Sequence, residues 1–168
     1  MPSFGLVNCR PSLALDTSGE INVDVDRATA FAAVRDPARL ARCIPGCTDL
    51  REVGPDRYTA LLTSRVAFMK LSFTVAIDVV KIEPPSSLEA RITGDAVGLS
   101  GHLVSTAHLQ LLENGGRRTT IRYGMEVGLT GKLGGLGQPV LKATSAKMAR
   151  EFGDNLKAEI ERVSGPPA

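Results

Sequence analysis

The sequence predicts an α+β fold in which a curved antiparallel sheet of six to seven strands wraps around one long C-terminal helix. Two observations lead to this prediction. Between residues 47 and 127, apolar and polar residues alternate in successive segments separated by turns, which is typical of strands with one dry face. From residue 133 to residue 163, apolar residues recur every three or four positions, which indicates a helix with one apolar face. Because no other long element is left to cover the dry face, the sheet must curve around this helix.

The segment before residue 47 predicts one strand followed by two short helices. Residues 20–26 alternate between polar and apolar, as a strand does. Asp26 is a good N-cap for a helix over residues 27–35. Asp36 followed by Pro37 provides a second cap and a first helical residue, so a second short helix is expected to run to about residue 42.

Turn signals divide the rest of the chain into strands. Residues rich in Gly, Pro, Asn and Asp favour turns because they adopt the required backbone angles. The expected strands cover residues 58–68, 71–79, 88–93, 103–111 and 119–127, and the clearest turns between them are Gly54-Pro55-Asp56, Pro84-Pro85-Ser86 and Asn114-Gly115-Gly116.

Length and composition indicate a single domain without a nucleic-acid surface. We expect an irregular extension over residues 1–13, one domain over residues 14–163 and a disordered tail over residues 164–168. The formal net charge of +2 is too small to indicate a surface that tracks phosphates, so nucleic acid is not expected as a partner. Residues 1–15 lack the pattern of a signal peptide, and the three cysteines form no secreted framework. The chain is therefore expected in the cytoplasm, with any membrane contact peripheral and at the inner face.

The cysteines and histidines give weak signals for chemistry. Cys43 and Cys47 are separated by three residues, whereas a metal or redox motif has two and needs further ligands. We interpret them as small residues that pack a loop. His102 lies in a glycine-rich loop and His108 on a polar strand face, and neither has an evident nucleophile or carboxylate partner. No catalytic or metal-ligating residue is predicted.

Residues 131–137 are rich in glycine but do not form a phosphate-binding loop, because the terminal Gly-Lys-Ser/Thr is absent. The segment either opens a cavity as a hinge or lets the chain pack closely, since glycine permits both.

The apolar face of the sheet is the main candidate site. Only 4% of the residues are aromatic and none is Trp, so few large side chains are available to fill the space under the helix. Small or polar residues at inward positions, and flexible methionines, suit an apolar pocket with a few polar groups. A fully packed core is the alternative. The residues predicted to line the cavity are Phe68, Phe73, Val75, Ile92, Leu103, Ser105, Ala107, Tyr123, Met125, Leu136, Val140, Thr144 and Met148.

Several motifs resemble one family. They are Asp36-Pro37, Leu40, the run Cys43-Ile44-Pro45-Gly46-Cys47 with Leu50, and the glycine-rich segments 94–101 and 131–137. Over roughly residues 15–162 the chain resembles the CoxG family of carbon monoxide dehydrogenase subunits, within the START-like or Bet v 1-like (SRPBCC) superfamily of helix-grip domains.

The resemblance implies an accessory protein rather than an enzyme. Its expected partners are a molybdenum hydroxylase of the carbon monoxide dehydrogenase type and the membrane to which that enzyme is recruited. The expected ligand is a quinone (menaquinone or ubiquinone) or a lipid, with Tyr123 or Ser105 as hydrogen-bonding partner of a quinone oxygen.

Two alternatives remain open from the sequence. A START-like enzyme of the cyclase or hydrolase type would need a titratable group in the cavity, and Tyr123 is the one such group on the inward faces. A packed assembly factor would act through its surface, for which the basic residues Lys142, Lys147, Arg150 and Lys157 of the last helix are candidates.

Overall fold

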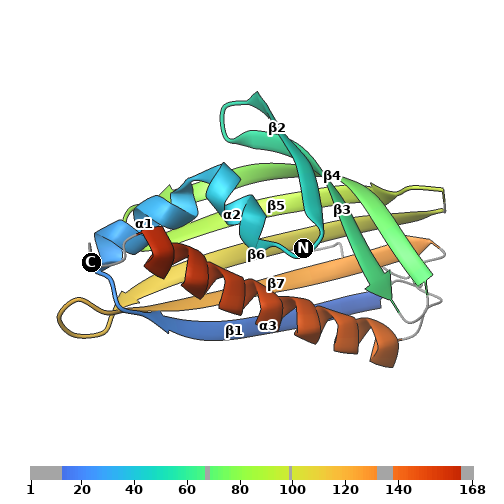
Figure 1. Ribbon diagram of the computed structural model, residues 1–168. Helices are drawn as coiled ribbons and strands as arrows, with labels where there is room; N and C mark the ends of the chain where they lie inside the picture. The colour runs from blue at the N-terminus through green and yellow to red at the C-terminus, as the bar shows by residue number, and fades with distance from the viewer. Residues whose placement is uncertain (1–12, 67–68, 99, 132–137, 164–168) are drawn as a thin grey trace, which may run out of the picture.

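Seven antiparallel strands form one sheet, and three helices cover its concave side (Figure 1). A computed structural model describes residues 13–66, 69–98, 100–131 and 138–163. The strand order is β1-β7-β6-β5-β4-β3-β2, so every neighbouring pair except β1 and β7 is consecutive in the chain. The elements are β1 (Leu13–Val23), α1 (Arg27–Arg35), α2 (Pro37–Cys43), β2 (Cys47–Gly54), β3 (Arg57–Val66), β4 (Met69–Glu83), β5 (Ser87–Ala96), β6 (Gly101–Glu113), β7 (Thr119–Gly131) and α3 (Gln138–Val163).

This architecture confirms the predicted α+β helix-grip fold, and it corrects the start of the first strand. β1 begins at Leu13 rather than at residue 20, and it ends at Val23 rather than at residue 26. It pairs with β7 over its whole length, from Leu13 opposite Leu129 to Val23 opposite Thr119. The alternation fades before residue 20 because Thr17, Ser18 and Gly19 give no contrast between the two faces.

Four other strands, β4 to β7, are longer than their sequence patterns predicted. β4 has a register shift between Val79 and Lys81 against β5, which interrupts the alternation but not the strand. β7 continues past the predicted end at residue 127 and ends at Gly131. Residues 132–137, like the predicted N-terminal extension up to residue 12 and the tail 164–168, lie outside the described residues.

The two short helices have the predicted caps. The Asp26 carboxylate accepts a hydrogen bond from the Thr29 backbone N–H at 3.3 Å. The Asp36 carboxylate accepts from the backbone N–H groups of Ala38 and Arg39. These bonds satisfy amide groups that have no partner within the helix, which is why Asp is favoured at both positions.

The apolar side chains of the dry face form two separate clusters. The first cluster lies under α1 and α2 and is centred on buried residues such as Val34, Leu111, Ile121, Leu156 and Ile160. The second cluster lies toward the other end of the sheet and is centred on Leu15, Leu71, Phe73, Leu129 and Leu141. α3 contributes residues to both, so it spans the length of the dry face.

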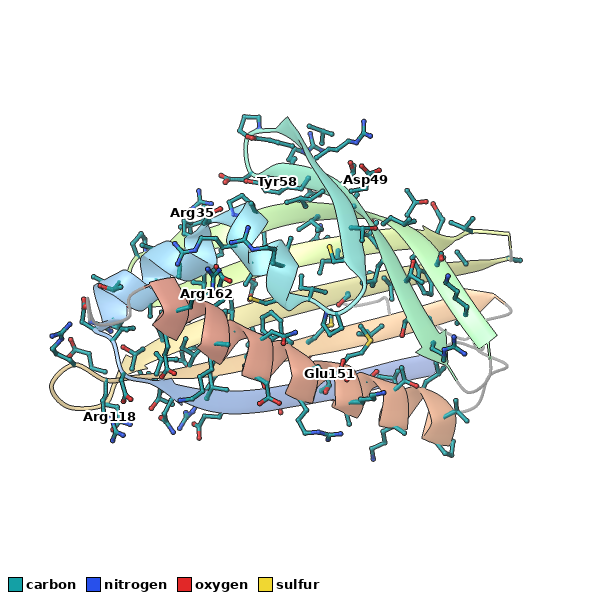
Figure 2. The ribbon with its side chains drawn as sticks, viewed as in Figure 1. Arg35, Asp49, Tyr58, Arg118, Glu151 and Arg162 are labelled. Atoms are coloured by element: carbon teal, nitrogen blue, oxygen red, sulfur yellow. The ribbon has the colours of Figure 1, made fainter. Side chains whose placement is uncertain are left out.

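Ionic groups fix the C-terminal end of α3 to the short helices. The Glu159 carboxylate lies 2.7 Å from Arg162, 3.0 Å from Arg42 and 3.4 Å from the Arg39 guanidinium. Arg162 sits where the end of α3 meets these helices (Figure 2). The hydrogen bond from Arg162, followed by that from Arg42, holds the pKa of Glu159 below its ordinary value of 4.5.

Replacing Glu159 with Gln is expected to lower the free energy of unfolding at pH 7 by about 1 kcal/mol, because it removes the charge that three arginines share. Since the folded-state pKa is depressed, this stabilisation is complete above pH 4.5 and is lost as the pH falls through the folded-state pKa. Urea titrations of both proteins across acidic pH check this. A difference that stays constant down to about pH 3 would contradict the ionic role.

Side chains of α3 also cover part of the backbone of the edge strand β1. The Lys157 ammonium donates a hydrogen bond to the Asn22 carbonyl oxygen. The Glu161 carboxylate accepts one from the Asp24 backbone N–H at 3.3 Å. The helix is therefore joined to the edge of the sheet as well as to its face.

Candidate ligand-binding site

The centre of the dry face, between the two clusters, is lined by small and flexible side chains. Across the sheet, Ala90 of β5, Ala107 of β6 and Met125 of β7 lie opposite one another. Ser105 lies one inward position further along β6, between Ile92 and β7. Ala90, Ser105, Ala107 and Met125 belong to neither cluster. The middle of the dry face thus carries small or flexible side chains instead of large rings.

Ser105 is the unusual polar group of this surface. Its side chain is 1% exposed, and its hydroxyl has no hydrogen-bond partner among the described residues. Two arginine Nε atoms share that property, but their guanidinium groups are anchored in ion pairs. A buried hydroxyl without a partner costs about 1–3 kcal/mol, so a native position of this kind needs an explanation. A ligand that carries a hydrogen-bonding group would provide one.

Several inward side chains around Ser105 are only half-buried, although their strands alternate as the dry face requires. Ile92, Leu103, Met125 and Val127 all have this intermediate exposure. On the same strands, Leu109, Leu111 and Ile121 of the first cluster are buried. The packing under α3 is therefore complete under the short helices and incomplete around Ser105, and an apolar ligand would remove this surface from water.

The predicted lining residues do not all lie at this centre. Phe73, Val75, Ile92, Leu103 and Val140 belong to the second cluster or pack against it. Tyr123 packs against the first cluster. Ser105, Ala107, Met125, Thr144 and Met148 belong to neither, and Phe68 and Leu136 lie outside the described residues. Binding by these residues stays a prediction.

Tyr123 is engaged by the protein itself. Its hydroxyl donates a hydrogen bond of 3.0 Å to the Ala149 carbonyl oxygen of α3. Its ring meets Phe152 edge to face, with 5.2 Å between the ring centroids. Gly19 and Gly153 make room for the ring, since a Cβ atom at either position would overlap the tyrosine oxygen. Of the two hydroxyls predicted to meet a quinone oxygen, that of Ser105 is therefore the one without a partner among the described residues.

Two of the three predicted lining residues in the described α3 also have protein partners for their side chains. The Thr144 hydroxyl donates to the Val140 carbonyl oxygen at 3.1 Å, a bond within the helix. The Met148 sulfur accepts a hydrogen bond of 3.6 Å from the Ser64 hydroxyl of β3. Ser64 was not singled out from the sequence. Its inward position follows from the alternation of β3, but its partner could not be predicted.

The two cysteines of the Cys-Ile-Pro-Gly-Cys run have packing roles. Cys43 is buried, and its thiol donates to the Arg39 carbonyl oxygen at 3.4 Å. Burial raises its pKa to about 11. Burial also raises the pKa of the half-buried Cys47. Both thiols are therefore protonated at neutral pH and are poor nucleophiles and metal ligands.

The histidines lie away from this surface. The prediction for His102 was wrong in two respects: it belongs to β6 and not to a loop, and it has a carboxylate partner. It is exposed, and its Nδ1 is 2.8 Å from the Asp95 carboxylate. His108 lies on the outer face, where its ring covers Gly124. Two grooves of about 480 and 340 Å³ lie nearby, around Gly19, and include Tyr123 alone among the predicted lining residues. Charged side chains line both grooves, Glu20 and Arg122 the larger and Glu20 and Arg150 the smaller, so neither is suited to an apolar ligand.

Comparison with solved structures places this arrangement in a known class. A conserved protein from Geobacillus kaustophilus is 24% identical, with a TM-score of 0.78 over 89% of this chain and 96% of that chain. A START superfamily protein from Mycobacterium smegmatis is 10% identical, with a TM-score of 0.66 over 88% and 98% of the two chains. A truncated norcoclaurine synthase from Thalictrum flavum is 9% identical, with a TM-score of 0.61 over 92% and 96%. The fold is thus the START-like helix-grip fold.

The family follows from the sequence itself. The model of the CoxG family, whose description is that of a carbon monoxide dehydrogenase subunit, matches residues 19–161. The chain belongs to this family. No curated protein matches it. Among the described residues, no helix has the length and apolar character needed to cross a bilayer.

Proposed function

We propose that this protein is a non-catalytic accessory protein of a molybdenum hydroxylase system of the carbon monoxide dehydrogenase type. It binds an apolar ligand, a quinone such as menaquinone or ubiquinone or else a lipid, between the sheet and α3. From the cytoplasm, and at the inner face of the membrane, it helps to recruit the enzyme or to deliver its electrons. Membership of the CoxG family supports the choice of partner.

The observation that carries the ligand proposal is the Ser105 hydroxyl. It is buried and has no partner within the described chain, and the side chains around it are apolar and incompletely packed. Each square ångström of apolar surface that a ligand covers contributes about 25 cal/mol. A prenylated quinone offers both the apolar surface and an oxygen that can accept from Ser105, so its chemistry fits.

Tyr123 argues for binding over catalysis. Burial raises the pKa of its hydroxyl, which is already donated to Ala149 of α3. A general base must be deprotonated near neutral pH and within reach of its substrate, and this hydroxyl meets neither condition. The enzyme hypothesis, which the norcoclaurine synthase fold raises, thus lacks a base on the described dry face.

Native mass spectrometry and solvent extraction of the protein purified from its own host test the proposal. We expect a quinone or lipid at near-equal stoichiometry. Protein that arrives empty, and whose melting temperature does not change when quinones are added, would favour a packed assembly factor instead.

Ser105→Ala tests the polar contact separately. The loss of one neutral hydrogen bond, about 0.5–1.5 kcal/mol, should weaken binding of a short-chain menaquinone roughly two- to tenfold. Binding of a prenyl hydrocarbon without the quinone ring should not change. Thr106→Ala, the next residue on the opposite face of β6, is the control. Equal weakening of both ligands by Ser105→Ala would contradict a hydrogen bond to the quinone oxygen.

A further inference from the structure

The two long sides of α3 are held very differently. On the side of β1, the helix backbone accepts hydrogen bonds from the hydroxyls of Tyr123 and Thr17, at 3.0 and 3.5 Å. Lys157 joins the same side to the β1 backbone. The Tyr123 ring is enclosed between glycines of β1 and α3, which leaves no room for even one added methyl group. This side is held by several bonds along the helix, and the charged residues Glu20 and Arg150 line the smaller groove that lies on it.

The opposite side faces the hairpin of β2 and β3. Apart from the ion pairs of Glu159 with α2, it is joined at two points among the described residues. One is the hydrogen bond of 3.0 Å from the Asn155 side-chain amide to the Cys43 carbonyl oxygen at the end of α2. The other is the 3.6 Å bond between Ser64 and Met148. Asn155 follows Met148 by seven positions, which is about 10 Å along a helix.

Apolar side chains border the window between these two contacts. Cys47, Leu50 and Leu62 of the hairpin pack against the second cluster but keep an intermediate exposure. Cys47 and Leu62 lie opposite each other in the hairpin. The Cys-Ile-Pro-Gly-Cys run therefore forms one border of this window, and the Met148–Asn155 stretch of α3 forms the other. Glu151 belongs to that stretch (Figure 2).

We propose that the apolar ligand passes in and out between α3 and the β2–β3 hairpin, and that the Ser64–Met148 contact separates to let it through. This inference rests on the proposed function, since it concerns the same ligand and the same interior surface. Two properties of Met148 make the Ser64–Met148 contact easier to break than the other contacts of α3. A thioether sulfur is a weak acceptor, and an unbranched methionine side chain changes rotamer readily.

In the proposed movement, α3 stays in place at the Asn155 contact. One turn further along α3, Glu159 joins Arg42 and Arg39 of α2, so this end of the helix is anchored by charge-assisted bonds. The N-terminal half of α3 has no such bond to β3 among the described residues. Movement of that half away from β3 would widen the window while the anchored end stays in place.

Crosslinking each side of α3 tests the route. One variant carries Ser64→Cys with Met148→Cys, and a matched control carries Thr17→Cys with Ser145→Cys, whose parent residues are in contact on the β1 side. Both are made with Cys9 and Cys47 replaced by Ser and are bridged with dibromobimane while holding a short-chain menaquinone. Transfer of the radiolabelled quinone to excess phosphatidylcholine vesicles is then timed.

Bridging the Ser64–Met148 side is expected to slow transfer about tenfold or more, because a rate falls tenfold for each 1.36 kcal/mol added to its barrier. Bridging the β1 side should leave the rate unchanged. Equal rates with and without the first bridge, or slowing by the control bridge alone, would overturn the route while the bound quinone still supports the proposed function. Unbridged protein that holds no quinone would overturn both.

A second variant needs no crosslink. Met148→Leu keeps an apolar side chain of similar size but removes the sulfur acceptor, so the Ser64 hydroxyl loses its partner. We expect faster transfer of the same quinone, by roughly two- to fivefold for the loss of one weak hydrogen bond. An unchanged or slower rate would overturn the role of this contact.

Discussion

Replacing Met125 with Trp, or Ala107 with Phe, is expected to abolish binding of a quinone while the protein still folds. The two residues lie opposite each other on β6 and β7, at the centre of the dry face and outside both apolar clusters. A large ring at either position takes up the surface that the ligand would cover. Overpacking costs about 1–3 kcal/mol, which a domain stabilised by about 5–15 kcal/mol survives.

The neighbouring position on the other face of β6 supplies the control. Val104 is 47% exposed on the outer face, so Val104→Phe adds the same ring without reaching the interior. Quinone binding is measured by titration against the melting temperature, and folding by circular dichroism. Folded Met125→Trp and Ala107→Phe proteins that bind with unchanged affinity would place the ligand elsewhere.

Gly46→Ala is expected to have the largest effect on stability. Gly46 has a φ of +79°, and its carbonyl oxygen accepts a hydrogen bond from the Thr63 backbone N–H of β3 at 3.0 Å. A Cβ atom at this position would overlap the Thr63 carbonyl oxygen. Since that oxygen belongs to the backbone, it cannot rotate away as a side chain could. The free energy of unfolding should fall by about 3 kcal/mol, the upper range for backbone strain.

Gly115→Ala separates the steric contact from the backbone angle. Gly115 has a φ of +76°, close to that of Gly46, but nothing lies within 4 Å of its Cβ position. It should cost only about 1 kcal/mol, the usual penalty for a left-handed residue with a side chain. Equal losses in the two variants, measured by urea unfolding, would show that contact with Thr63 contributes nothing.

The predictable part of this molecule is the part set by local pattern. Alternation placed the inward faces of β3 to β7, and the capping aspartates fixed the start of both short helices. The start of β1 could not be predicted, because residues 17–19 have no apolar member and are held in the sheet by pairing with β7. A strand segment that is held only by pairing with its neighbour shows no alternation of apolar and polar residues in its own sequence.

The same distinction between local pattern and distant contacts holds for the candidate site. The small residues on the dry face are visible in the alternating pattern, so Ser105 and Ala107 could be chosen from the sequence. The partners of hydroxyl groups could not. The Tyr123 hydroxyl is bonded to Ala149, and its ring lies against Gly153. Both residues reach Tyr123 only when α3 packs on the sheet, so the sequence could not show that this hydroxyl already has a partner. The same is true of Ser64, whose partner Met148 is 84 residues away.

The bonds from Lys157 and Glu161 to the backbone of β1 have a consequence for the behaviour of many copies in solution. An open sheet ends in a strand whose free N–H and C=O groups can recruit a strand from another molecule, which is how edge-to-edge aggregation begins. At Asn22 and Asp24 these groups are already occupied by side chains of the last helix. The end of β1 is thereby made less available for pairing with another molecule by the same helix that covers the interior.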